Sequence, residues 1–118
     1  MPGILVVDDE PEILKFVGDA LKEEGYDVQT AVDGRQAIDI ASRDRPDLVV
    51  LDIRLPRLDG HGVARELRRL YGNVPILVMT ADGRAQEKAR TVGAFDFLPK
   101  PFDLDHLFNV IRGCLNTP

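Results

Sequence analysis

Acidic residues follow two apolar runs of this sequence at the points where the runs end. Asp8 and Asp9 come directly after Ile4–Val7, and Asp52 ends the run Pro46–Asp52. A carboxylate oxygen can attack phosphorus and form an aspartyl phosphate, provided that cations neutralise the charge on the group being transferred. Asp52 is the best candidate for this nucleophile, because its run has the length and the β-branched content of a strand buried in the middle of a parallel sheet. Taken alone, Asp52 could equally begin a turn.

Two further polar residues stand at the ends of later apolar runs. Thr80 ends the run Pro75–Thr80, and Lys100 comes just after Ala94–Leu98. The hydroxyl of Thr80 could donate to a phosphoryl oxygen, and Lys100 could neutralise its charge. Each kind of residue has an ordinary explanation, since an acidic pair before a helix usually caps it and a lone lysine usually lies at the surface. Their joint position at successive strand ends is what predicts a site.

Three carboxylates at one site predict a divalent cation. Asp8, Asp9 and Asp52 would repel one another and raise one another's pKa unless a cation lies among them. Oxygen ligands suit Mg²⁺, which takes only one or two carboxylates and keeps several of its waters. Together, Mg²⁺ and Lys100 would balance the three negative charges, so the loaded site would be ready for an anionic phosphoryl group.

The elements that must bring these residues together alternate along the chain. Apolar runs predict five strands, and apolar residues that recur every three or four positions predict a helix after each of them. The predicted strands are Ile4–Val7, Tyr26–Ala31, Pro46–Asp52, Pro75–Thr80 and Ala94–Leu98. Such alternation implies a parallel sheet with helices on both faces. In open sheets of this kind, ligands bind beyond the carboxyl ends of the strands, and all the polar residues named above could share that edge.

Other parts of the chain are predicted to have structural roles only. Residues 26–31 alternate in the manner of an edge strand, and residues 83–92 have the weakest helical pattern, which predicts a short and mobile helix. Cys114 lies in an apolar helical pattern, which favours a small buried thiol. His61 and His106 have no second histidine at ligand spacing, so both are expected in solvent.

Length and charge limit the classes of function. The 118 residues, of which 44% are hydrophobic and 30% charged, have the size of one compact domain, and we expect residues 1–118 to form a single one. With 20 acidic and 15 basic residues, the net charge of -5 argues against direct nucleic-acid binding by this domain and favours protein partners. No apolar run is long enough to span a membrane and no secretory signal is recognisable, so we expect a cytoplasmic protein.

The motifs around these residues resemble those of the receiver domain of the two-component response regulators, and the resemblance covers the whole chain. The matching pieces are Val6–Glu10, Leu51–Asp52 with Pro56 and Asp59–Gly60, Thr80–Ala81, and Lys100–Phe102. The resemblance implies an α/β fold of the flavodoxin-like type, a doubly wound five-stranded parallel sheet in the order 2-1-3-4-5 with five helices. It also implies a cis peptide bond before Pro101.

The resemblance assigns a role to each acidic residue of the predicted site. Asp52 would be phosphorylated, taking the phosphoryl group from a phosphohistidine on a sensor histidine kinase or a histidine phosphotransfer protein. Asp8, Asp9 and Asp52 would bind Mg²⁺, and the backbone carbonyl of Arg54 would complete the protein ligands. Such a domain is not an enzyme beyond its own phosphorylation and dephosphorylation.

Three residues would respond to the phosphoryl group. By resemblance, Thr80 and Lys100 contact it, and Phe97 occupies the family's switch position, which is often Tyr or His. We expect Thr80 to move inward and Phe97 to turn into the freed space, which would reshape the surface of the fourth helix, the fifth strand and the fifth helix. That surface would signal to an unknown downstream protein, and phosphorylation could also promote a dimer.

The first predicted helix is the expected contact for the phosphoryl donor. As in relatives, Pro11, Leu14 and Gly18 would present a small apolar patch to the helical bundle of a kinase. Leu14 could equally belong to the core.

Arg54 and Asp82 are a second pair of interest, because they lie two positions after Asp52 and Thr80. Opposite charges there could pair across the mouth of the site and slow hydrolysis of the acyl phosphate. They could equally be unrelated surface charges, since an exposed pair contributes little energy.

Two other classes of function are weighed against the signalling domain. An aspartyl-phosphate phosphatase usually has a second Asp two positions after its nucleophile, where this chain has Arg54. A flavodoxin-like electron carrier has a Ser, Thr and Gly loop for the flavin phosphate, where this chain has the acidic run Asp8–Glu10, which would repel it. Within the signalling class, the chain could be a stand-alone regulator or the excised receiver of a DNA-binding regulator or hybrid kinase.

Overall fold

The computed structural model describes residues 2–54, 59–81 and 84–115. Within these ranges five strands alternate with five helices. Their bounds are β1 Gly3–Val7, α1 Pro11–Glu23, β2 Asp27–Ala31, α2 Gly34–Arg43, β3 Leu48–Asp52, α3 Gly60–Tyr71, β4 Ile76–Thr80, α4 Ala85–Val92, β5 Asp96–Pro99 and α5 Leu104–Leu115. Each predicted strand is present, although β3 and β5 each begin two residues later than predicted.

The five strands form one parallel sheet in the order β2-β1-β3-β4-β5. The order implied by the resemblance is therefore confirmed, with β3 in the centre and β2 at one edge. All five residues of β3 and of β4 are buried, as continuous apolar runs predict, whereas β2 is mostly exposed. The prediction of an edge strand at residues 26–31 is also confirmed.

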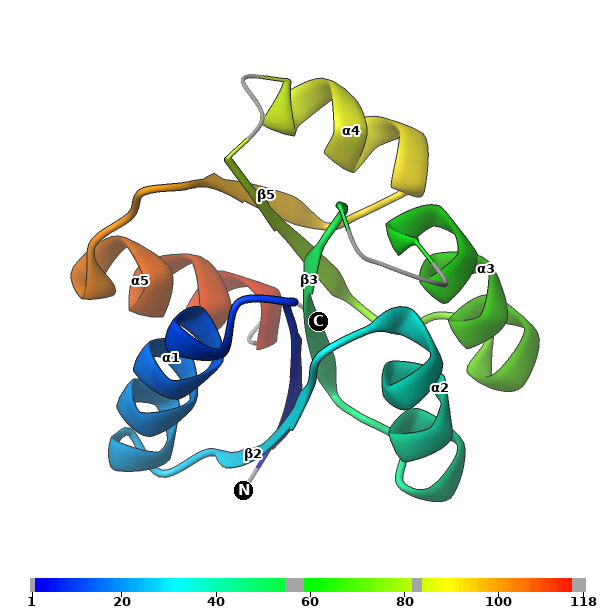
Figure 1. The fold of residues 1–118 in the computed structure, drawn as a ribbon, viewed down its shortest axis with the longest axis horizontal. Coiled ribbons are helices and arrows are strands. Elements are labelled where there is room, and N and C mark those ends of the chain that lie inside the picture. The colour runs from blue at the N-terminus through cyan, green and yellow to red at the C-terminus, as the bar shows by residue number, and fades with distance from the viewer. Residues whose placement is uncertain (1, 55–58, 82–83, 116–118) are drawn as a thin grey trace.

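Helices cover both faces of the sheet, as Figure 1 shows. Residues of β1 alternate between the two faces, because successive side chains of a strand point in opposite directions. Ile4 and Val6 pack with α1 and α5, whereas Leu5 and Val7 pack with α2, α3 and α4. The two apolar layers hold β1 and β3 rigidly at the centre, so the residues at their carboxyl ends have fixed positions.

The short α4 packs through few residues. Among its described side chains, Ala89 and Val92 are the buried ones, in agreement with the weak apolar pattern of this segment. Within the described residues, no helix has the length and apolar composition needed to cross a membrane.

Candidate functional site

Strand pairing brings the acidic residues together. Val7 lies beside Leu51 in the β1–β3 pair, so the next residues along the two strands, Asp8 and Asp52, are neighbours at the carboxyl edge. Asp8 is fully buried and Asp52 is 5% exposed. Asp8, Asp9, Glu10 and Asp52 each place one carboxylate oxygen within 4.8 Å of the others. The three predicted acids are therefore at one site, and Glu10 joins them.

Lys100 reaches this cluster from the end of β5. Its Nζ donates to Asp8 Oδ2 at 2.7 Å, to Asp52 Oδ2 at 3.1 Å and to Glu10 Oε1 at 3.2 Å. The Lys100 backbone N–H donates to the carbonyl of Thr80 at 2.9 Å. The peptide bond between Lys100 and Pro101 is cis, as the resemblance implied. The ammonium group is thus shared by acids from two different strand ends.

Two pKa values in the cluster lie above their ordinary values, for different physical reasons. Burial raises the pKa of Asp8, and it outweighs the opposing hydrogen bonds from Lys100 and from the Glu10 N–H. Burial alone would lower the pKa of Lys100, but the hydrogen bond to Asp8 and the negative charges of Asp52 and Asp8 outweigh it, so this pKa lies above its ordinary value. Lys100 therefore stays charged at neutral pH, and one lysine faces several carboxylates.

The carboxylate of Asp52 is held from two sides. Oδ1 accepts a hydrogen bond from the Arg54 N–H at 2.9 Å, and Oδ2 accepts one from Lys100. Because Asp52 also ends a fully buried strand, its oxygens have a defined orientation at the edge of the sheet. A fixed carboxylate beside a cation is suited to attack an electrophile that approaches from solvent.

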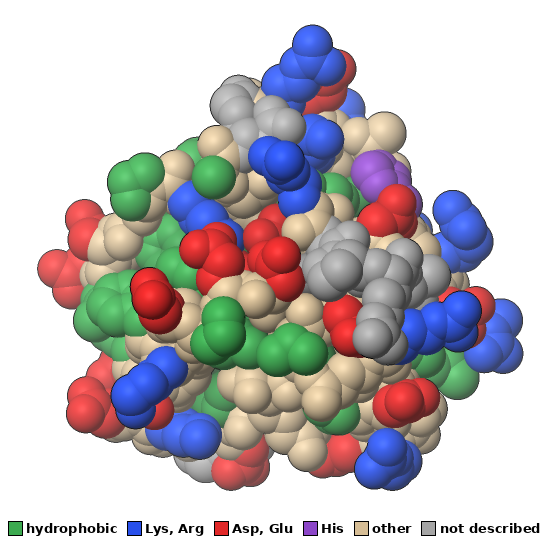
Figure 2. Space-filling view, viewed as in Figure 1, with side chains coloured by type: hydrophobic (Ala, Val, Ile, Leu, Met, Phe, Trp, Pro, Cys, Tyr) green, Lys and Arg blue, Asp and Glu red, His purple; other side chains and the backbone are tan. Residues whose placement is uncertain are grey.

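Thr80 lies beside this carboxylate. Met79 pairs with Asp52 across β3 and β4, and Thr80 is the next residue, fully buried. A cavity of about 190 Å³ is lined by Asp9, Glu10, Asp52, Arg54, Thr80, Ala81 and Lys100. Figure 2 shows acidic side chains gathered on this face of the molecule, with hydrophobic side chains beside them. The four strand ends named from the sequence thus surround one opening.

The donor set of the cluster fits Mg²⁺. All of its side-chain ligands are carboxylate oxygens, and among the described residues the group that could hold a metal contains neither His nor Cys. Lys100 supplies one positive charge against the acids, so a divalent cation would relieve the remaining repulsion.

Phe97 lies outside the site, whereas Arg54 lines the cavity and donates its backbone N–H to Asp52. Phe97 pairs with Val78 across β4 and β5 and packs, partly buried, against the apolar layer under α2, α3 and α4. The side chain of Arg54 is exposed. Asp82 and Pro56 lie outside the described residues, so the Arg54–Asp82 pair remains a prediction.

Glu10 is the site residue that sequence reasoning missed. An acid before a helix is expected to cap it, and Glu10 does occupy the N-cap position of α1. Its side chain, however, makes no capping hydrogen bond and extends to Lys100 instead. The signal was the third consecutive acid after β1, which is one more than a cap requires.

The predicted patch at Pro11, Leu14 and Gly18 is reduced to the exposed Pro11, and the alternative that Leu14 belongs to the core is confirmed. Leu14 and Gly18 are buried, because they lie on the side of α1 that packs on the sheet. Phe16 is 46% exposed, since it lies two positions and therefore more than half a turn from Leu14. An apolar cavity of about 420 Å³ lies beside the acidic cluster, lined by Glu10, Ile13, Phe16, Ala81, Lys100, Pro101 and Phe102.

The residues expected to have no chemistry agree with that expectation in part. Cys114 is buried, and burial, with the charge of Asp96, raises the pKa of its thiol to about 11. His106 is exposed, as predicted, whereas His61 is only partly exposed.

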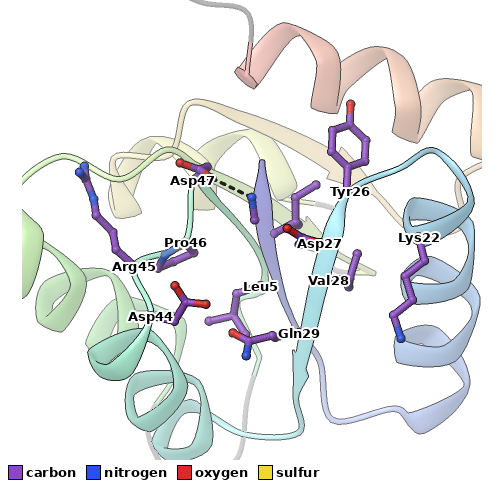
Figure 3. Close-up of a pocket in the computed structure, with 12 residues that line it drawn as sticks. Leu5, Lys22, Tyr26, Asp27, Val28, Gln29, Asp44, Arg45, Pro46 and Asp47 are labelled. Atoms are coloured by element: carbon purple, nitrogen blue, oxygen red, sulfur yellow. Dashed lines mark hydrogen bonds between the residues drawn. The ribbon is translucent and has the colours of Figure 1, made fainter. Parts of the chain in front are cut away.

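A larger cavity, of about 530 Å³, lies at the amino ends of the strands, away from the acidic cluster (Figure 3). Its walls come from the amino ends of β1 and β2 and from the segment before β3, and they mix the acids Asp27, Asp44 and Asp47 with Lys22 and Arg45. None of the residues that line it is one of the polar strand-end residues. Chemical composition, rather than cavity size, therefore locates the candidate site.

Comparisons with known proteins agree with this geometry. Residues 4–112 match the family model described as the response regulator receiver domain. The chain is 46% identical over 114 residues to the response regulator MprA of Mycolicibacterium vanbaalenii. The matched region covers 95% of this chain and 49% of that protein. The chain is also 42% identical over 119 aligned positions to the DNA-binding dual master transcriptional regulator RpaA of Synechocystis. That match covers 98% of this chain and 49% of that protein. The chain spans about half the length of these curated relatives.

One solved structure that is similar in fold is also a receiver domain. The receiver domain of the sensor histidine kinase PA1611 from Pseudomonas aeruginosa matches with a TM-score of 0.88 and 33% identity, over 98% of both chains. That structure has a magnesium ion coordinated in its active-site cleft.

Proposed function

The chain belongs to the response regulator receiver family, and we propose that Asp52 is the residue of this member that accepts the phosphoryl group. The observation that carries the proposal is the position of the Asp52 carboxylate at the end of a buried central strand, 3.1 Å from Lys100 Nζ and beside the second buried acid, Asp8. We further propose that the donor is a phosphohistidine on a sensor histidine kinase or a histidine phosphotransfer protein.

The side chains around Asp52 supply the charge balance of the transfer. As the phosphorus–nitrogen bond of the donor breaks, a carboxylate oxygen of Asp52 forms the new bond to phosphorus. Lys100 then stabilises the negative phosphoryl oxygens, and the hydroxyl of Thr80 donates to one of them. The site carries out this reaction only on itself, so the domain is a signalling module rather than an enzyme with a separate substrate.

The proposal includes a magnesium site. Asp8, Asp9 and Asp52 would hold the ion, together with the backbone carbonyl of Arg54. When bound, Mg²⁺ would neutralise charge on the transferring group. Asp8 is held for this role by its hydrogen bonds from the Glu10 N–H and from Lys100.

The donor is proposed to dock beside the acidic cluster. The apolar cavity lined by Ile13, Phe16, Pro101 and Phe102 adjoins the site, because Glu10 and Lys100 line it too. An apolar surface next to the reacting carboxylate can hold a partner helix while its phosphohistidine faces Asp52.

The output is proposed to run through Thr80 and Phe97. Phosphorylation would draw Thr80 toward the phosphoryl group, let Phe97 turn inward, and reshape the surface of α4, β5 and α5 for a downstream protein or a second copy of the domain. Phe97 has no ring hydroxyl, so packing alone would report its position.

A longer regulator is the second proposal. The relatives MprA and RpaA are about twice as long as this chain, and RpaA is named as DNA-binding. We infer that residues 1–118 act as the receiver part of a cytoplasmic regulator of this kind, in which another part would contact DNA.

The test is an intact-mass measurement with Mg²⁺ and acetyl phosphate. The wild-type protein should gain the mass of one phosphoryl group and Asp52→Asn should gain none. Removal of Mg²⁺ with EDTA should abolish the gain. An unmodified wild-type protein, or an equal adduct on Asp52→Asn, would contradict the proposal.

A further inference from the structure

The last turn of α3 is bonded to both of the helices beside it. The hydroxyl of Tyr71 donates to the carbonyl of Ala41 in α2, and a guanidinium N–H of Arg68 donates to the carbonyl of Val92, the last residue of α4. The guanidinium carbon of Arg45, just after α2, lies 5.6 Å from the centroid of the Tyr71 ring. Hydrogen bonds thus join the carboxyl ends of both α2 and α4 to α3. These contacts lie at the amino ends of the strands, away from the acidic cluster.

The carboxyl end of α4 is fixed by several contacts at once. Gly93 adopts the left-handed conformation, with φ of 76°, and the Arg68 guanidinium occupies the space where a Cβ on Gly93 would stand. The N–H groups of Gly93 and Ala94 donate to the carbonyls of Arg90 and Ala89 at 3.1 and 2.8 Å. Carbonyls in the last turn of a helix have no hydrogen-bond partner within the helix. A cation placed there can donate to them and interacts favourably with the negative end of the helix dipole.

The amino end of α4 has weaker support within the described residues. Its N-cap residue, Arg84, makes no capping hydrogen bond through its side chain, and its ion pair with Glu87, at 3.9 Å, is exposed and contributes little energy. The buried side chains described in this helix, Ala89 and Val92, both belong to its second half. The weakly held amino end is also the one nearer in sequence to Thr80, at the edge of the sheet that carries the acidic cluster.

We propose that Arg68 is a positioning residue on which α4 pivots. It holds the carboxyl end of the helix in place, so a change at Thr80 displaces the amino end while β5 keeps its position. The cause of the movement rests on the proposed phosphorylation of Asp52, whereas the tie between Arg68 and α4 does not. The part of the surface change that belongs to α4 would then be a rotation of this helix about its fixed carboxyl end.

The experiment measures distances from α1 to each end of α4. In a Cys114→Ala background, spin labels are placed at Glu23→Cys with either Gln86→Cys or Thr91→Cys, all exposed positions. With Mg²⁺ and beryllofluoride, the distance to position 86 should shift on the order of 1–2 Å and the distance to position 91 should not. In Arg68→Ala, both distances should shift.

A second arm needs no phosphoryl analogue. Arg68→Ala should broaden the distance distribution at position 91 in the free protein. Arg69→Ala is the matched control, because Arg69 lies in the same turn but, within the described residues, bonds through its guanidinium to Glu66 of its own helix. If Arg68→Ala fails to fold, Arg68→Met keeps most of the aliphatic stem, removes the hydrogen-bond donor to Val92 and should broaden the same distribution.

Three results would overturn the pivot. The first is a distribution at position 91 that stays sharp in Arg68→Ala. The second is a shift at position 91 as large as that at position 86 while Arg68 is present. The third is no shift at either position when bound beryllofluoride is detected by fluorine NMR. Equal beryllofluoride binding by Asp52→Asn would instead count against the proposed function. The measurement on the free protein would still decide whether Arg68 holds the carboxyl end of α4.

Discussion

Lys100 Nζ lies 2.7 Å from Asp8 Oδ2 and 3.1 Å from Asp52 Oδ2, so it is bonded more closely to the end of β1 than to the proposed phosphoacceptor. All three side chains are at least nine-tenths buried. One ammonium group therefore neutralises charge from two neighbouring strands in a poorly solvated place.

Loss of this lysine should destabilise the protein. Lys100→Met would leave Asp8 and Asp52 buried without their counter-charge, and we expect the free energy of unfolding to fall by about 3–5 kcal/mol in EDTA. Mg²⁺ should restore more stability to the variant than to the wild type, because it would replace the missing positive charge. Urea unfolding with and without Mg²⁺ measures both effects. Lys15→Met is the control, since its pair with Asp19 is exposed and its loss should have no measurable effect.

The raised pKa of Asp8 makes stability depend on pH. Because the folded protein binds this proton more tightly than the unfolded chain, protonation of Asp8 contributes stability that is fully present below the ordinary pKa of 3.8. The contribution is lost as the pH rises through the folded pKa. The side chain of Asp8→Asn is neutral at every pH. Its stability relative to the wild type should therefore increase as the pH rises from the ordinary pKa to the folded pKa, and level off above the folded pKa. The increase should be about 1.4 kcal/mol for each tenfold difference in proton affinity between the folded and unfolded protein.

Urea unfolding of both proteins in EDTA, at several pH values from 3.5 to neutrality (roughly the span of carboxyl titration), gives this difference. A difference that stays constant over the series would show that Asp8 titrates in the folded protein as it does in the unfolded chain.

Phe16 should matter to a protein donor and not to a small one. Phe16→Ala removes a half-exposed ring from the cavity beside the site, and we expect phosphotransfer from a histidine kinase that labels the wild type to slow roughly tenfold. Labelling by acetyl phosphate should be unchanged. Phe95→Ala is the matched control, because Phe95 is 49% exposed but lies just before β5, at the opposite edge of the sheet. Equal effects of the two substitutions would remove Phe16 from the docking surface.

Phe97 should be needed for the response to phosphorylation rather than for phosphorylation itself. Phe97→Ala should gain the phosphoryl mass with acetyl phosphate, at a cost in stability of about 1–2 kcal/mol, below that for a fully buried ring because the side chain is partly exposed. NMR shift changes induced by beryllofluoride in α4, β5 and α5 should be lost in Phe97→Ala and kept in Phe97→Tyr. If they persist in Phe97→Ala, the ring does not transmit the change.

The sequence alone determined the parallel sheet and brought most of the polar residues of the candidate site to one end of its strands. Continuous apolar runs such as Leu48–Leu51 require burial on both faces, and the helical spacing between the runs leaves parallel pairing as the economical arrangement. The sequence therefore assigns the polar residues at the run ends to one end of the sheet: Asp8, Asp52, Thr80 and Lys100. The order of the strands needed the resemblance as well, because alternation alone permits several orders.

Only the tertiary structure decided which side chains share contacts. The bonds of Lys100 span 92 and 48 residues, and no local pattern states that one lysine will choose Asp8 and Asp52 together. The role of Glu10 and the exposure of Phe16 depend on how α1 rotates against the sheet, and the tie from Arg68 to Val92 depends on how α3 lies beside α4. Apolar periodicity fixes what each element buries, whereas the contacts of its polar residues follow from the packing of whole elements.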